Sequence, residues 1–407
     1  MPVRTPGRHD EHRRCRSNRS RSRSAMSVRP RIEALPNSLI ADVANYGRGR
    51  PGLIALWFGE GDVPTPDFIG DACARAIRDG YVFYAPVRGI PELRTALSAY
   101  LGRTYGAPVD VERITVHTSG MTAIMVSLQA LIDPGDEVVV VSPVWPNVFS
   151  AVEILGGIVR EVPLERTERG WRLDPERLFA ACGPRTKLVF VNSPSNPTGW
   201  TMPLEDLRAV LDFTRRRGLW MMSDEVYSRL VYDGAHAPSM LRIAEPEDRV
   251  LVVNSFSKNW AMTGWRLGWV VAPPELAPHY EKLVQFNNSG TPGFVQMAGV
   301  AALEQGEGFL AEMRERCRRG RDIACDALER MPRVRLVRPE GAFYAFFAVE
   351  GAADSLALAR RIVDEAKVGL APGSAFGAGG EGHLRLCFAS SPDRLEQAME
   401  RLAPVLR

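Results

Sequence analysis

The sequence predicts an α/β protein built on a doubly wound, mostly parallel sheet. Between residues 113 and 270, short apolar stretches alternate with stretches of helical pattern, which is typical of strands joined by crossover helices. The predicted strands at 137–142, 187–191, 219–223 and 249–253 are mostly apolar, as expected of parallel strands that helices cover on both faces. The length of 407 residues allows one large or two medium domains with a sizeable core.

Composition narrows the class of protein further. A hydrophobic content of 45% with 24% charged residues is ordinary for a soluble globular protein. No apolar run approaches the ~18 residues that a membrane helix needs, so we expect no membrane span. The six cysteines form no CxxC pair and no secretory leader is present, which predicts a reduced, cytoplasmic protein. The six histidines show no metal-binding spacing, so we predict no metal site.

The first 25 residues differ from the rest of the chain. They hold eight arginines and two acidic residues; without them, 51 basic and 48 acidic residues fall to 43 and 46, and the net charge becomes −3. We predict that residues 1–26 form a disordered tail. A nucleic-acid arm or a transit peptide is one interpretation, although transit peptides are poor in acidic residues. We favour the interpretation that Met26 is the true start and that the residues before it are upstream sequence read from a misassigned start, and we therefore predict no nucleic-acid partner.

The strongest chemical signal lies in the stretch NSFSKNWAMTGWRLGW at 254–269. It follows the predicted strand 249–253, so Lys258 lies at a strand's carboxyl end, where open α/β sheets bind ligands. The chain has only four lysines, at 187, 258, 282 and 367, among 51 basic residues. A Schiff base needs a primary amine that can lose its proton, which guanidinium cannot do. That argument alone leaves an ordinary solvated lysine open.

Other polar motifs follow other predicted strands. The TSGMT stretch at 118–122 follows strand 113–117 and opens a helix, and a glycine turn at a helix start is a natural anion site. The NSPSNPTG stretch at 192–199 follows the predicted strand 187–191, and the DEVY stretch at 224–227 follows the predicted strand 219–223. Carboxyl ends of parallel strands share one edge of a sheet, so we expect these motifs to meet.

The SFSK stretch, followed after seven residues by Arg266-Leu267-Gly268, resembles the signature of class I aminotransferases, the fold-type-I pyridoxal-phosphate enzymes. The loop 192–199 is similar to the family's Asn-Pro-x-Asn-Pro-Thr-Gly loop, except that Ser193 shifts the leading residues. The resemblance covers about residues 30–405. It implies that cofactor contacts come from Tyr84, Ser119, Gly120, Met121, Trp145, Asn196, Asp224, Tyr227, Ser255, Ser257, Lys258 and Arg266.

The resemblance implies catalytic roles for three of these residues. Lys258 forms the internal aldimine and then acts as general base and acid. Asp224 keeps the pyridine nitrogen protonated, because a buried opposite charge favours the charged form; its alternative role is a helix N-cap. Tyr227 donates to the cofactor's phenolic oxygen, as does Asn196, and Trp145 stacks on the ring or simply fills the core.

Substrate contacts are expected from Gly59, Asn196 and Arg385. The arginine matches the one that clamps the substrate carboxylate, since its planar fork binds a carboxylate bidentately. Gly59 offers its backbone, although the family's usual proline two residues on is Gly61 here. Tyr84 lies ahead of a Gly-Ile-Pro-Glu-Leu-Arg element whose tyrosine, in the family, reaches the cofactor of a neighbouring subunit.

The resemblance also implies the domain organisation and the assembly. We predict a large cofactor-binding domain at 63–299, a smaller α+β lobe made of 27–62 and 300–407, and a homodimer with shared active sites. The substrates are then an amino acid and a 2-oxo acid.

The amino donor is predicted to be uncharged. Aspartate-specific members supply a second positive group, either a lysine where this chain has Met121 or an arginine from a loop matching 285–303, where this chain has no basic residue. Arg48, Arg50 and Arg88 are the remaining sources of such a charge. The alternatives are an aspartate aminotransferase, or a lyase of the C–S lyase or aminocyclopropane-carboxylate synthase type. A non-enzymatic regulator would need a fused helix-turn-helix domain, for which the tail is too short.

Overall fold

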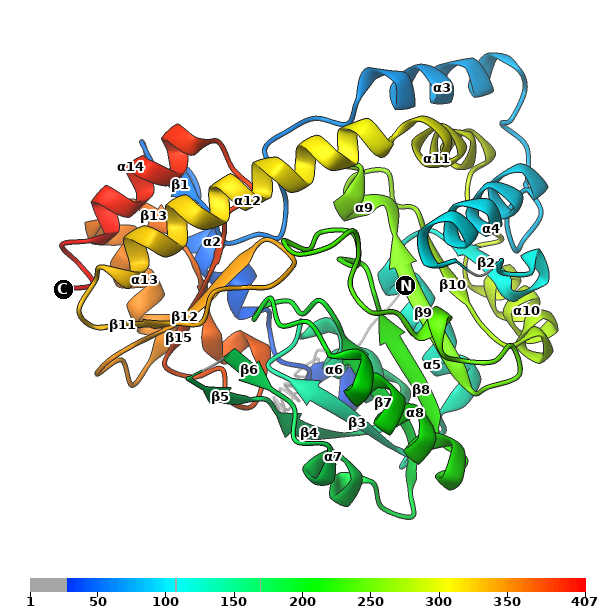
Figure 1. The fold of residues 1–407 in the computed structure, drawn as a ribbon, viewed down its shortest axis with the longest axis horizontal. Helices are drawn as coiled ribbons and strands as arrows, with labels where there is room; N and C mark the ends of the chain where they lie inside the picture. Colours follow the sequence, from blue (N-terminus) through cyan, green and yellow to red (C-terminus); the bar gives the residue numbers. More distant parts are fainter. Residues whose placement is uncertain (1–27, 107, 169) are drawn as a thin grey trace, which may run out of the picture.

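The computed structural model describes residues 28–106, 108–168 and 170–407, and its centre is a seven-stranded sheet (Figure 1). In hydrogen-bonded order the strands are β2 (Ile114–His117), β10 (Gly268–Val271), β9 (Val250–Ser255), β8 (Trp220–Asp224), β7 (Thr186–Asn192), β3 (Glu137–Ser142) and β4 (Ile158–Pro163). Only β10 runs antiparallel to its two neighbours; the other pairings are parallel. The predicted mostly parallel sheet is confirmed.

Helices cover both faces of this sheet. Alternate side chains of β3 enter two different apolar clusters, Val139 and Val141 in one and Val138 and Val140 in the other. The first cluster is closed by α4 (Pro91–Tyr105), α7 (Pro175–Ala181), α8 (Leu204–Arg217) and α11 (Gly293–Gln305), with α3 (Asp67–Arg78) packed on α11. The second is closed by α5 (Gly120–Leu131), α6 (Asn147–Leu155) and α10 (Ala277–Asn287). This two-sided burial explains why the strands are nearly continuously apolar.

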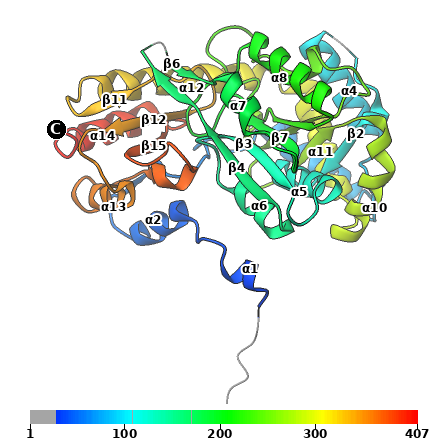
Figure 2. The ribbon, with the colours of Figure 1, turned by 90° about the horizontal axis from the view of Figure 1, so that it is seen from below.

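A smaller lobe lies beside the large sheet in both views (Figures 1 and 2). Its four-stranded sheet has the order β11 (Val334–Leu336), β12 (Tyr344–Val349), β15 (His383–Cys387) and β14 (Ala371–Pro372). The two ends of the chain meet here, because β1 (Ile54–Ala55) pairs in parallel with β13 (Val368–Gly369). The lobe's helices are α2 (Leu39–Gly47), α13 (Ser355–Glu365) and α14 (Pro392–Leu402).

The long helix α12 (Glu307–Glu329) runs from the end of α11 to α14 and β11, and so connects the two sheets (Figure 1). Short elements complete the chain: α1 (Pro30–Glu33), α9 (Phe256–Asn259) and the hairpin of β5 (Glu165–Thr167) and β6 (Gly170–Arg172). In the part of the chain that the structure describes, no helix is long and apolar enough to cross a membrane. The predicted tail, residues 1–26, lies outside the described residues, and the domain boundaries at 62 and 300 stay predictions.

Candidate active site

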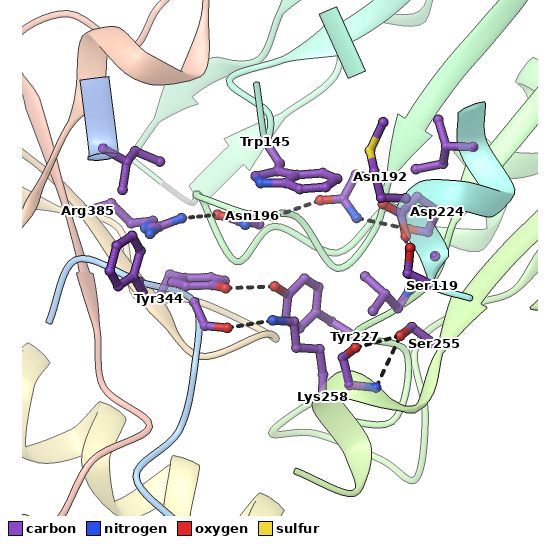
Figure 3. A pocket seen from close by; sticks show the side chains of 18 of the residues that line it. Ser119, Trp145, Asn192, Asn196, Asp224, Tyr227, Ser255, Lys258, Tyr344 and Arg385 are labelled. Atoms are coloured by element: carbon purple, nitrogen blue, oxygen red, sulfur yellow. Dashed lines mark hydrogen bonds between the residues drawn. The ribbon is translucent and has the colours of Figure 1, made fainter. Parts of the chain in front are cut away.

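A cavity of about 220 Å³ opens where the carboxyl ends of the parallel strands face the smaller lobe (Figure 3). The residues that line it are Ile40, Phe58, Gly59, Ser119, Gly120, Met121, Ile124, Trp145, Asn192, Asn196, Asp224, Val226, Tyr227, Ser255, Ser257, Lys258, Arg266, Tyr344 and Arg385. They come from segments separated by more than 300 positions in the chain, so the fold itself assembles the site.

One end of the cavity is built to receive an anion. Ser119 caps α5, its Oγ accepting the N–H of Thr122 at 3.0 Å, so the first turn of that helix faces the cavity with its N–H groups and positive dipole end. The hydroxyls of Ser255 and Ser257 lie 2.9 Å apart at the same end. Arg266 adds a guanidinium from a backbone with a φ of +54°, a strained conformation that non-glycine residues rarely adopt.

Glycine at position 268 allows this end of the cavity to form. A Cβ added to Gly268 would lie 2.6 Å from the backbone nitrogen of Gly120 and 2.9 Å from the backbone oxygen of Asn254. The backbone of β10 therefore presses directly against the start of α5. A side chain here would push the helix N-terminus away from Ser255, and the anion-binding groups would separate.

Lys258 lies on α9, the single helical turn that follows β9. Its Nζ donates a hydrogen bond to the backbone oxygen of Gly59, in the segment that follows β1 (Figure 3). Burial lowers the pKa of this amine to about 8, helped by the nearby charges of Arg385 and Arg266. About a tenth of the amine is therefore neutral at pH 7, far more than for an ordinary lysine, and able to act as a nucleophile or a base.

Asp224, the last residue of β8, is buried in the cavity wall with 6% of its surface exposed. Its Oδ1 accepts the N–H of Val226 at 3.2 Å, and a turn rather than a helix follows it, so it is not a helix N-cap. Burial raises the pKa of this carboxyl to about 7; the Val226 hydrogen bond and the charge of Lys258 offset only part of that rise. A cation placed beside Asp224 in the cavity would restore the ionised carboxylate.

Arg385, on β15, is 2% exposed and closes the opposite end of the cavity. One of its terminal nitrogens donates to Asn196 Oδ1 at 2.8 Å, and the other donates to the backbone oxygen of Trp57. The guanidinium carbon lies 4.6 Å from the ring centroid of Tyr344 and 4.9 Å from that of Phe376, so two aromatic rings hold its plane. A planar, fixed guanidinium inside a cavity suits a carboxylate ligand.

Comparison with known proteins identifies the family. The sequence model of the family described as "Aminotransferase class I and II" matches residues 54–402. The chain belongs to this family.

Relatives and solved structures agree with the assignment. The chain is 38% identical over 392 residues to the aspartate/prephenate aminotransferase of Thermus thermophilus, covering 95% of this chain and 99% of that protein. It is 37% identical over 372 residues to a probable aspartate/prephenate aminotransferase of Aquifex aeolicus, covering 90% and 91%. A solved single mutant of the Thermus thermophilus aspartate aminotransferase superposes with a TM-score of 0.88 at 37% identity, covering 93% of this chain and all of that one. The predicted family, fold type and aminotransferase activity are confirmed.

In this aminotransferase, the cavity brings together all the site residues predicted from the sequence except one. Tyr84 is 93% exposed and does not line the cavity of its own chain. This placement is compatible with a role at a neighbouring subunit, which stays a prediction, as do the individual roles of the lining residues.

Six lining residues were not predicted: Ile40, Phe58, Ile124, Asn192, Val226 and Tyr344. Asn192 and Val226 could have been found, since each lies within a motif already recognised, at 192–199 and 224–227. Ile124 follows Met121 by one helical turn on α5, so helical spacing would also have indicated it. Ile40, Phe58 and Tyr344 belong to segments whose patterns look like ordinary core or loop sequence.

Proposed function

We propose that this aminotransferase holds pyridoxal phosphate in the cavity and uses it to move the amino group of an L-amino acid with an uncharged side chain to a 2-oxo acid. The observation that carries the proposal is that one cavity contains a lysine with a lowered pKa, a buried carboxyl with a raised pKa and an anion-binding helix start. When bound, the cofactor supplies a carbonyl carbon that amines attack and a protonated ring that withdraws electrons from the substrate α-carbon.

The donor set fits this group. The start of α5, the hydroxyls of Ser255 and Ser257, and Arg266 suit the phosphate. Asp224 lacks a strong cationic partner of its own, and a protonated pyridine nitrogen would be that partner. The indole of Trp145 offers an aromatic face, and Figure 3 shows it on the same side of the cavity as Asn196.

Lys258 has the properties that a proton carrier needs. Its Nζ lies in the cavity, and its pKa of about 8 lets it gain and lose a proton near neutral pH. We assign to it the covalent link to the cofactor and, once released, the removal of the substrate's α-proton and its return. Tyr227 and Asn196 would donate to the phenolic oxygen of the cofactor.

The substrate carboxylate is assigned to Arg385. The guanidinium already lies in the cavity wall between two rings, so little rotamer entropy is lost when it binds a ligand. Its present partners, Asn196 Oδ1 and the Trp57 backbone oxygen, are neutral acceptors, and a carboxylate would satisfy the positive charge better.

The proposal that the amino donor has an uncharged side chain rests on the other residues of the cavity wall. Ile40, Met121 and Ile124 line it with apolar surface. With the start of α5 occupied by the cofactor phosphate, a second carboxylate beside these side chains would be buried without a partner, at a high desolvation cost.

The arginines that could have reached this region are bound elsewhere in the chain. Arg48 donates to Asn45 at 2.9 Å, Arg50 pairs with Asp364, and Arg88 pairs with Glu112 at 3.1 Å. Aspartate remains the second candidate donor, because the curated relatives are named for it.

We further propose that two copies of the chain form a dimer with shared sites. Val82, Phe83 and Tyr84, in the connection between α3 and α4, are 53%, 83% and 93% exposed, and Phe286 on α10 is 84% exposed. Three consecutive large side chains so exposed are unusual on a monomeric protein, and a second copy would cover them. Analytical ultracentrifugation should give twice the mass of the chain, and Phe83→Glu should shift it towards the monomer.

One assay tests the function. The holoenzyme is incubated with leucine, methionine, phenylalanine, alanine or aspartate, with 2-oxoglutarate or pyruvate as acceptor, and both 2-oxo acid formation and ammonia release are followed. We expect formation of a new 2-oxo acid without stoichiometric ammonia, and a higher kcat/KM for an uncharged donor than for aspartate. Ammonia release matching turnover would indicate a lyase instead, and a clear preference for aspartate would select the second candidate.

A further inference from the structure

Tyr344 occupies a central position in the cavity that the motifs did not predict. It is the first residue of β12, and its side chain is fully buried. Its hydroxyl lies 2.7 Å from the hydroxyl of Tyr227, and its ring packs against the guanidinium of Arg385 at 4.6 Å. Figure 3 shows Tyr344 between these two residues, with the dashed line joining the two phenols. Tyr227 follows β8 of the large sheet, whereas Arg385 belongs to the smaller lobe.

The position of the Tyr344 hydroxyl is tightly restricted. A Cβ added to Gly59 would lie 2.0 Å from this oxygen, so only glycine at position 59 leaves room for it. The ring is held on its other side by Arg385, which is itself held by Phe376. The Tyr344 hydroxyl is therefore held where it meets the hydroxyl of Tyr227 at 2.7 Å.

Two phenols that share one hydrogen bond must divide the roles of donor and acceptor. If Tyr227 donates its proton to a ligand oxygen in the cavity, the bond between the phenols can only run from the Tyr344 O–H to the Tyr227 oxygen. A donor that itself accepts a hydrogen bond becomes a stronger donor, because the chain of bonds is mutually polarised. Removing the Tyr344 hydroxyl should therefore weaken the bond that Tyr227 makes to the ligand.

We propose that Tyr344 is a positioning residue that acts through Tyr227 and Arg385: its hydroxyl strengthens the hydrogen bond from Tyr227 to the phenolic oxygen of the cofactor, and its ring fixes the plane of the substrate-binding guanidinium. This proposal rests on the proposed function of the cavity. Its two parts are separable by mutation, because phenylalanine keeps the ring and removes the hydroxyl, whereas leucine removes both.

The charged and titratable groups around the two phenols set the background for a titration. Arg385 and the thiols of Cys387 and Cys317 face Tyr344, while Arg385 and Asp224 face Tyr227. Tyr344→Phe leaves each of these groups in place. A change in titration between wild type and this variant therefore reports the missing hydroxyl.

The experiment is a pH titration of the visible absorbance of the cofactor bound to the resting enzyme. A weaker hydrogen bond to the phenolic oxygen disfavours its anionic form, so Tyr344→Phe should raise the midpoint by about 0.1 to 0.6 pH unit, because polarisation changes a charge-assisted hydrogen bond by about 10–30% of its value. The control is Tyr280→Phe, which removes a buried tyrosine hydroxyl bonded to the Ser127 hydroxyl at 2.6 Å, outside the cavity. Its midpoint should equal that of the wild type.

The ring is tested with a non-reactive monocarboxylate inhibitor. Tyr344→Phe should bind it as tightly as the wild type, and Tyr344→Leu should bind it at least about fivefold more weakly, because the guanidinium loses one of its two ring contacts. An unshifted midpoint in Tyr344→Phe, or equal inhibitor binding in Tyr344→Leu, would overturn the corresponding half of the inference while leaving the proposed function standing. A wild-type protein without a visible cofactor band would overturn both.

Discussion

The raised pKa of Asp224 predicts that the cofactor-free protein loses stability as the pH rises. In an unfolded chain this carboxyl titrates near 3.8, and in the folded protein it titrates at about 7. Between these values the folded state holds a proton that the unfolded state has released. The contribution of this proton to the free energy of unfolding is therefore complete below about pH 4. It falls by about 1.4 kcal/mol per pH unit until about pH 7. The total effect is on the order of 4 kcal/mol.

The assay compares urea unfolding of cofactor-free wild type and Asp224→Asn at several pH values between 5 and 8. The asparagine cannot ionise, so the stability of the wild type should fall relative to that of the variant as the pH rises. The difference between the two proteins cancels the titrating groups that do not interact with Asp224. The pKa of Glu225, which burial raises to about 7, is raised in part by the charge of Asp224, so Glu225→Gln is made in both backgrounds to remove its contribution. Adding pyridoxal phosphate should flatten the curve for the wild type, because a cation beside Asp224 lowers its pKa.

A difference between wild type and Asp224→Asn that does not change from pH 5 to pH 8 would refute the reasoning. It would mean that Asp224 is already ionised in the empty site, through water or a cation that the burial argument does not include. A curve that the cofactor leaves unchanged would instead show that the cofactor's charge does not lie beside this carboxyl.

Three other predictions concern the substrate and the chain terminus. Arg385→Lys should raise KM for every amino donor about tenfold, because one charge-assisted hydrogen bond to the substrate carboxylate is lost. A lower kcat with an unchanged KM would count against the assignment of this carboxylate to Arg385. Met121→Lys should raise kcat/KM for aspartate relative to leucine about tenfold. The control is Met125→Lys, one turn further along α5 and outside the cavity lining, which should leave this ratio unchanged. Equal ratios in the two variants would contradict an apolar donor pocket. A chain that starts at Met26 should match the full chain in turnover and cofactor content, and loss of either would show that the arginine-rich segment is needed.

Sequence patterns predicted the large sheet well because its strands are short apolar runs that each end in a polar motif. The strand predicted at 137–142 coincides with β3, and the strand predicted at 187–191 lies within β7. Lys258 and Asp224 were recognisable because the end of a parallel strand fixes where the next residues lie. Local sequence therefore determined the half of the site that a single sheet edge carries.

The other half depends on how the smaller lobe sits against the large sheet, and no local pattern encodes that. Ile40 lies on α2, whose apolar residues Val43 and Ala44 enter the core of the smaller lobe. From the sequence pattern Ile40 looks like a core residue of the same kind, although it also lines the cavity. Tyr344 starts a strand in which five of the six residues are buried, and in the sequence it looks like any core aromatic residue. Its hydrogen bond to Tyr227 spans 117 positions of the chain. Contacts of this kind can be predicted only when the positions of the two lobes relative to each other are known.

The central claim, that Lys258 carries the cofactor, can be tested directly by reductive labelling. The holoenzyme is reduced with borohydride and digested, and the peptides are examined by mass spectrometry for a phosphopyridoxyl group. The chain provides its own controls, because its other lysines are only three: Lys187, Lys282 and Lys367. We predict one phosphopyridoxyl group per chain, on the peptide that contains Lys258. Labelling of another lysine in its place, or no labelling of a protein that retains the cofactor, would contradict the account.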